Sequence, residues 1–253
     1  MDKELLLLTL KQSKNEPFIL VDDLIQAKNE SKVAAFFVEL NSQGFHFQAT
    51  IDNNYQITRE QRAKLAILGF MNDIDFDKII NELIWQEFEL LTTIVGDEFG
   101  YIAKTGLNFS TEDRKYQIDV ILKANPYVLF IDCKHYGGTG KKSVLKKAAE
   151  EQITRVEAVK ENFAKLQEKI SIKGWKKIVL IPMVVTWLDD EIFFHEFVPV
   201  VPFTKLRSFF QNFYLYFEDI LKLKFKIEKN IFSRYLLHLK RELLLSYTQH
   251  KNY

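Results

Sequence analysis

Two carboxylates and one lysine interrupt an apolar segment at residues 116–136, Tyr116-Gln-Ile-Asp119-Val-Ile-Leu-Lys-Ala-Asn-Pro126-Tyr-Val-Leu-Phe-Ile-Asp132-Cys133-Lys134-His-Tyr136. The apolar runs predict two short buried strands, Gln117–Leu122 and Tyr127–Cys133. Residues 123–126 predict a turn between them, because Pro fixes φ and Asn favours turn conformations. The segment therefore predicts two neighbouring strands near the middle of a sheet.

Side chains of a strand alternate between its two faces, so Asp132 and Lys134 share a face and Cys133 points the other way. Asp119, between two apolar neighbours, also points away from the apolar side of its strand. If the strands pair with these ends level, Asp119, Asp132 and Lys134 converge on one small volume. Two carboxylates at one point repel each other, and a divalent cation removes that repulsion. Hard oxygen ligands suit Mg²⁺.

The pattern of Asp119 followed by Asp132-Cys-Lys134 resembles the PD-(D/E)xK nuclease superfamily, which includes Mrr-type restriction endonucleases and archaeal Holliday-junction resolvases. Upstream, Trp85-Gln-Glu-Phe88-Glu89 precedes Gly100-Tyr101, similar to the Phe-Glu helix and Gly-aromatic turn of Mrr-like members. The resemblance covers roughly residues 75–217. It departs from the superfamily pattern at Ile118, where Pro is usual, and at Asp132, where Glu is more common.

The resemblance implies an α/β fold with a restriction-endonuclease-like mixed sheet flanked by helices. It implies a Mg²⁺-dependent DNA endonuclease, with Mn²⁺ as a substitute cation. Asp119, Asp132 and the backbone carbonyl of Cys133 would ligate the cation. Lys134 would orient or deprotonate the attacking water, and Glu89 would hold a cation-bound water or a second cation.

Two alternatives bear on these assignments. The Asp-x-Lys tripeptide alone is common, since Asp113-Arg-Lys115 also fits it, and a solvated Asp–Lys pair at a strand end contributes little. Glu87 competes with Glu89 for the role of the helix acid, because it lies on the inward side of a long helix expected from Asp75 or Asp77 to Ile94.

A basic segment follows the motif. Residues 134–177 hold 12 Lys and Arg against 5 Asp and Glu. Clustered cations beside a metal site favour a phosphate backbone, although a solvated helix is the simpler alternative. The expected DNA-binding residues are Lys141, Lys142, Lys146, Lys147 and Arg155, on a helix that begins after the glycine-rich turn 137–140 and reaches residue 169. Gln152 and Arg155 resemble the glutamine-bearing helix of the superfamily.

Residues 1–74 are expected to form a separate winged-helix-like domain. The pattern predicts helices at Asp2–Lys11, Val21–Ala27 and Lys32–Ser42, the last capped by Ser31, and then a hairpin over 45–57. This is the layout of a winged helix-turn-helix. The segment is net acidic, with 8 Lys and Arg against 11 Asp and Glu up to residue 75. DNA contact and a protein-binding or structural role therefore both stay open.

A nuclease-like domain is expected over 75–217 and a basic helical extension over 218–253. Further strands are predicted at 99–104, 175–185 and 192–200, a polar loop at 105–114 and a helix from residue 204 to 217. The extension is basic, with 8 Lys and Arg against 2 acids from residue 221. Its apolar stripe could cover the core or pair with a second copy, so a homodimer is an open prediction.

Composition limits the other possibilities. The net charge of +1 does not by itself indicate a nucleic-acid partner. One cysteine excludes a disulfide within the chain and a cysteine-ligated iron–sulfur cluster, and it fits a reducing cytoplasm. No membrane span or signal peptide is expected. The main alternatives to a nuclease are a catalytically inactive DNA-binding or assembly protein on a nuclease-like fold, and a winged-helix regulator.

Overall fold

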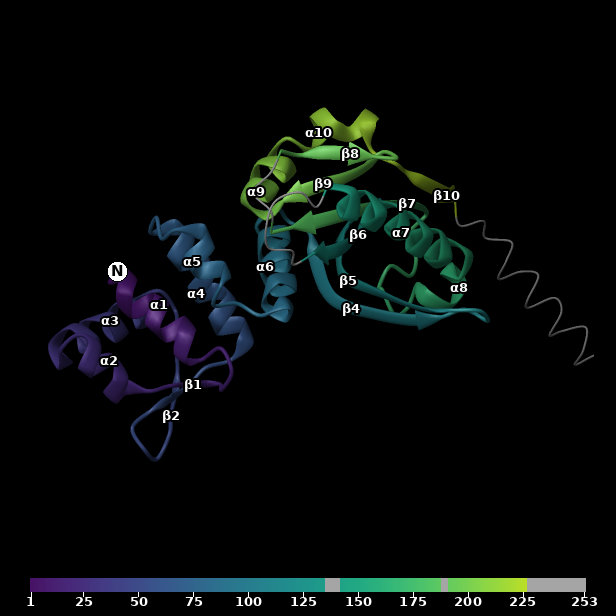
Figure 1. The fold of residues 1–253 in the computed structure, drawn as a ribbon. Coiled ribbons are helices and arrows are strands. Elements are labelled where there is room, and N and C mark those ends of the chain that lie inside the picture. Colours follow the sequence, from purple (N-terminus) through teal and green to yellow (C-terminus); the bar gives the residue numbers. More distant parts are fainter. Residues whose placement is uncertain (135–141, 188–190, 227–253) are drawn as a thin grey trace, which may run out of the picture.

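The computed structural model describes residues 1–134, 142–187 and 191–226. Its largest element is a seven-stranded mixed sheet with the order β4-β5-β6-β7-β9-β8, in which β10 also pairs with β7 (Figure 1). The strands are β4 (Ile102–Ser110), β5 (Lys115–Ala124), β6 (Tyr127–Lys134), β7 (Lys177–Thr186), β8 (Phe193–His195), β9 (Val198–Pro202) and β10 (Leu223–Lys226). Strands β4 to β6 form an antiparallel meander, whereas β6, β7 and β9 run parallel.

Helices cover both faces of this sheet. Helix α6 (Trp85–Glu98) and helix α9 (Phe203–Gln211) pack on one face, and α7 (Lys142–Glu161) with α8 (Phe163–Leu166) connects β6 to β7 across the other (Figure 1). A crossover helix is what a parallel strand pair requires. The predicted mixed α/β architecture with flanking helices is thus confirmed.

The two motif strands are as predicted, and slightly longer. Strand β5 pairs antiparallel with β6 from Val120 opposite Ile131 to Ala124 opposite Tyr127. The turn between them is shorter than expected, because only the two residues after Ala124 lie outside the strands. The strand interiors are buried on both faces, which explains their continuous apolar runs.

Several predicted boundaries were wrong. The strand predicted at 99–104 begins at Ile102 and continues to Ser110, through part of the predicted loop, because its polar residues alternate with the buried Leu107 and Phe109. The strand predicted at 192–200 is instead the β8–β9 hairpin, which turns at Glu196 and Phe197 with positive φ. The basic helix ends at Glu161 and not at residue 169. The final predicted helix is divided into α9, α10 (Phe213–Tyr216) and a 3₁₀ turn, Phe217–Asp219.

The long helix predicted from Asp75 to Ile94 is two helices, α5 (Phe76–Ile80) and α6. The chain leaves helical geometry after α5, and α6 starts anew at an extended N-cap, Ile84. The Glu87 carboxylate accepts a hydrogen bond from the backbone N–H of Ile84 at 3.0 Å. This cap satisfies an N–H that would otherwise lack a helical partner and so supports the restart.

The N-terminal segment holds four helices and a small antiparallel sheet of order β1-β3-β2. Its elements are α1 (Lys3–Gln12), β1 (Phe18–Ile19), α2 (Val21–Ala27), α3 (Glu30–Ser42), β2 (Gln48–Ala49), β3 (Tyr55–Gln56) and α4 (Arg59–Met71). Asn29, and not the predicted Ser31, caps α3, by accepting from the N–H of Lys32 at 3.0 Å. Helix α4 packs against α6, and one hydrophobic cluster runs from α1 through α6 to the sheet.

The turn predicted at 137–140, Lys141 and most of the C-terminal extension lie outside the described residues. In the described part of the chain, no helix combines the length and the hydrophobicity that a membrane span requires.

Candidate active site

The structure brings Asp119, in the middle of β5, beside Asp132, near the end of β6. The register that pairs Val120 with Ile131 places the two aspartates at the next position. The backbone N–H of Cys133 donates to Asp119 Oδ2 at 2.8 Å, which fixes the Asp119 carboxylate against β6. The predicted proximity of Asp119 and Asp132 is therefore present.

A kink in the β4–β5 hairpin accompanies this position. Leu107 pairs with Ile118 and Thr105 with Val120, which leaves Gly106 next to Asp119 in the ladder. Gly106 has a φ of +65°, a conformation that costs other residues free energy. Val120 and Leu122 of β5 pack in the cluster that includes α6, whereas Ile118, which regular alternation would place on their face, packs with Ile121 in the α7–α8 cluster. The change of face explains why strand alternation alone does not place Asp119.

Asp132 and Lys134 share a face of β6, as predicted, and form an ion pair. Lys134 Nζ lies 2.7 Å from Asp132 Oδ2 and 3.0 Å from Oδ1. Arg155 of α7 approaches the same carboxylate, with Nη1 3.0 Å from Asp132 Oδ1. Asp132 is buried, and its carboxylate is paired with both Lys134 and Arg155. Arg155, expected from the sequence to bind DNA, is thus part of the carboxylate site.

Glu89 is the buried helix acid nearest to this group. It is 9% exposed, and in the described chain its Oε1 has no hydrogen-bond partner. Burial raises the pKa of Glu89 to about 7, and the negative charge of Asp119 acts in the same direction. A carboxyl group with such a pKa exchanges protons near neutral pH, as general bases do.

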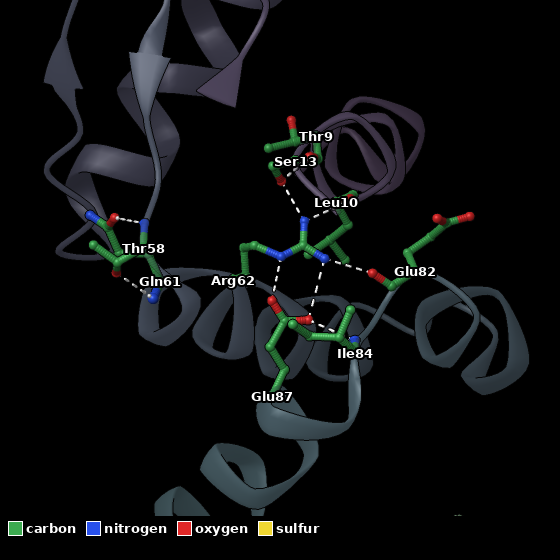
Figure 2. Close-up of polar contacts among 9 residues, drawn as sticks. All are labelled: Thr9, Leu10, Ser13, Thr58, Gln61, Arg62, Glu82, Ile84 and Glu87. Carbon is green, nitrogen blue, oxygen red and sulfur yellow. Dashed lines mark hydrogen bonds and ion pairs between the residues drawn. The ribbon is translucent and has the colours of Figure 1, made fainter. Parts of the chain in front are cut away.

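Glu87 has a different environment. Its carboxylate forms a buried ion pair with Arg62 of α4, with Arg62 Nε 2.5 Å from Glu87 Oε1 (Figure 2). Arg62 also donates to the carbonyls of Leu10 and Glu82 and to the Ser13 hydroxyl. The ion pair joins the N-terminal segment to the start of α6. This arrangement supports the choice of Glu89 over Glu87 as the candidate acid.

The electrostatics favour a further cation beside Asp119. Burial raises the pKa of Asp119 above its usual range, and the charge of Asp132 adds to this effect. The Cys133 N–H, Lys134 and Arg155 lower the pKa of Asp119 but do not cancel the rise. The Cys133 carbonyl faces the Asp119 side of β6, because the N–H and C=O of one strand residue point the same way.

These groups have the chemistry that Mg²⁺ prefers, namely carboxylate and carbonyl oxygens. Glu89 Oε1 is buried without a hydrogen-bond partner in the described chain, and burial raises the pKa values of Glu89 and Asp119, so a bound cation would stabilise the ionised form of both carboxylates. The residues therefore fit a divalent cation. In the described residues, however, no three acidic, His or Cys side chains are already gathered as a ligand set.

The basic surface lies on the first half of α7. Lys142, Lys146 and Lys147 are exposed there, and Lys142 Nζ lies 5.1 Å from the centre of the Phe193 ring. Lys141 is outside the described residues. Sequence reasoning missed two contacts, Arg155 with Asp132 and Arg62 with Glu87, because each joins residues far apart in the chain. An Arg within an otherwise apolar helix face, as at Arg62, is the signal that would have indicated a buried pair.

Comparisons with known proteins leave the family open. No protein-family model matches the chain. An uncharacterized protein of Archaeoglobus fulgidus is 29% identical over 136 residues, which cover 53% of this chain and 95% of that protein. A solved protein of unknown function, AF1548, aligns over 40% of this chain and 46% of its own, with 18% identity and a TM-score of 0.26. The protein VC1899 from Vibrio cholerae aligns over 86% of this chain and 51% of its own, with 11% identity and a TM-score of 0.34. The chain thus spans about half the length of each solved structure.

Proposed function

We propose that this protein is a divalent-cation-dependent DNA endonuclease of the PD-(D/E)xK type, with a restriction-endonuclease-like core and an N-terminal winged-helix-like domain. The observation that carries the proposal is the group of Asp119, Asp132 and Lys134 just beyond the paired residues Val120 and Ile131 of β5 and β6, with the buried Glu89 beside it. The proposal includes a cytoplasmic location.

Asp119, Asp132 and the Cys133 carbonyl would hold Mg²⁺ or Mn²⁺. When bound, the cation polarises the scissile phosphate and lowers the pKa of a water molecule. Lys134 orients the attacking water, and its positive charge stabilises the negative charge that develops on the phosphate oxygens. Glu89, with a pKa of about 7, takes up the proton that the water releases.

The exposed lysines of α7 favour a polyanionic substrate. Lys142, Lys146 and Lys147 follow β6 in sequence on the helix that also carries Arg155 to Asp132. A row of cations on the helix that reaches the carboxylate site suits a polyanion that extends beyond the scissile bond. DNA is therefore the proposed substrate.

A second candidate has one observation in its favour. Lys134 and Arg155 already neutralise Asp132, as would suit a binding protein that has lost catalysis. The two candidates differ in cleavage and not in binding.

The test is cleavage of labelled duplex, single-stranded and four-way-junction DNA with Mg²⁺, with Mn²⁺ and with chelator. We expect cation-dependent cleavage that Lys134→Ala abolishes. Lys115→Ala is the matched control, because it removes the lysine of the other Asp-x-Lys tripeptide. DNA binding without cleavage under every condition would overturn the nuclease proposal and favour the second candidate.

A further inference from the structure

Gln152 is a polar side chain without any solvent exposure, on the face of α7 that packs against the sheet. Its Nε2 donates to the Phe130 carbonyl at 2.8 Å, so its amide orientation is fixed by β6 itself. The remaining oxygen, Oε1, accepts from Arg155 Nη1 at 3.1 Å. Phe130 precedes Asp132 by two residues on the same strand. Gln152 therefore links the position of the Arg155 guanidinium to the strand that carries Asp132.

Arg155 Nη1 lies 3.0 Å from Asp132 Oδ1, and its Nη2 lies 3.5 Å from Glu151 Oε2. The Arg155 side chain is 17% exposed, so it is held from the core side and still reaches solvent. A guanidinium binds carboxylate and phosphate oxygens with the same planar geometry. The same group can therefore exchange one partner for the other without leaving its support.

The charges at the site favour the exchange of Asp132 for a phosphate as the partner of Arg155 once a divalent cation is bound. The two carboxylates Asp119 and Asp132 lie with the two cations Lys134 and Arg155, so their formal charges cancel. A divalent cation would bring this group to +2, and a phosphodiester would reduce that excess to +1. When a cation binds Asp132, the attraction between Arg155 and this carboxylate weakens, and the phosphodiester provides another anion for Arg155 to bind.

We infer that Arg155 is a further catalytic residue, which neutralises Asp132 in the cation-free protein and moves to the scissile phosphate when a divalent cation engages Asp132. Gln152 is the residue that positions it. This inference rests on the proposed nuclease function.

The first test measures Mn²⁺ binding by calorimetry without DNA, and single-turnover cleavage at saturating Mn²⁺. Arg155→Ala should bind Mn²⁺ about tenfold more tightly, because a competing positive charge is removed from Asp132. The same variant should cleave roughly 100- to 1,000-fold more slowly, because a charge that stabilises the transition state is lost. A merely structural arginine would weaken both. Loss of Mn²⁺ affinity in a folded Arg155→Ala protein would overturn the inference.

The second test is chemical rescue. Added methylguanidine should restore part of the cleavage by Arg155→Ala, whereas Arg155→Lys should keep wild-type Mn²⁺ affinity with reduced cleavage. Gln152→Met should slow cleavage about tenfold without rescue by methylguanidine, since it leaves the guanidinium present but unguided. Arg207→Ala is the matched control, because Arg207 pairs with Glu98 at 2.7 Å outside the site. Absence of rescue in a folded variant would overturn the inference.

The two proposals fail separately. If the wild type cleaves DNA and Arg155→Ala cleaves equally well, the inference fails and the nuclease stands. If the wild type binds Mn²⁺ and cleaves nothing, the nuclease proposal and the catalytic role of Arg155 both fail, whatever Arg155→Ala does to Mn²⁺ affinity.

Discussion

Replacing Arg62 by methionine removes the cation that joins the N-terminal segment to α6. The Arg62 and Glu87 side chains are 2% and 1% exposed, so solvent cannot neutralise the carboxylate that remains. Methionine keeps most of the side-chain length, which limits the change in packing. The variant therefore isolates the loss of charge and hydrogen bonds from the loss of volume.

The expected loss of stability is large. Removing one partner of a buried pair costs about 3–5 kcal/mol, because the other charge stays buried and unpaired. Arg62 also donates to two backbone carbonyls and the Ser13 hydroxyl, and these contacts are lost too. For a chain of this length, each kcal/mol lowers Tm by about 2–4 °C, so a fall of roughly 10 °C is expected.

Urea denaturation of three variants measures the effect. Lys64→Met on the same helix is the control, since Lys64 pairs with Glu60 at the surface and should change the free energy of unfolding by less than about 0.5 kcal/mol. Adding Glu87→Gln to Arg62→Met should recover at least about 1 kcal/mol, because the buried charge is gone. The reasoning is refuted if Arg62→Met stays within about 1 kcal/mol of wild type, or if adding Glu87→Gln recovers no stability.

Three further predictions concern the site. Because the pKa of Glu89 rises from 4.5 to about 7 on folding, its contribution to stability is present below pH 4.5 and is lost as the pH rises through 7. Urea denaturation should show the wild type losing stability relative to Glu89→Gln across this range, and a pH-independent difference would contradict it. Gly96→Ala should destabilise by about 1–3 kcal/mol, because the new Cβ would lie 2.6 Å from Leu122 Cδ2 where α6 meets β5, and a neutral result in thermal melts would show that α6 can shift. Replacing Lys146 and Lys147 by alanine should lower the slope of log affinity against log salt for duplex DNA by about 2, and an unchanged slope would remove them from the interface.

The sequence predicted those parts of the fold that depend on local patterns. The motif strands were recognisable because both of their faces are buried, which leaves a continuous apolar run. The outer half of β4 was missed because an edge strand keeps polar residues on its open face, and its strand geometry comes from pairing with β5. The break before α6 was missed because its cap depends on Glu87, whose charge is balanced by Arg62 from another helix.

In the candidate site too, some residues could be predicted from local patterns and others could not. Asp132 and Lys134 follow from strand alternation, and the structure keeps them on one face. The choice of Glu89 over Glu87 came from the family resemblance, since both are acids on a mostly buried helix. The Arg155 contact with Asp132 has no local signal, because it depends on how α7 crosses β6.

The most direct test of the nuclease assignment is the rate of supercoiled-plasmid cleavage with Mg²⁺ by the wild type, Asp132→Ala and Asp113→Ala. Asp113 is an exposed acid in the competing Asp-x-Lys tripeptide and serves as the matched control. We predict that the wild type and Asp113→Ala cleave at equal rates and that Asp132→Ala is at least about 100-fold slower. Equal cleavage by Asp132→Ala, or no cleavage by the wild type with any divalent cation, would contradict the assignment.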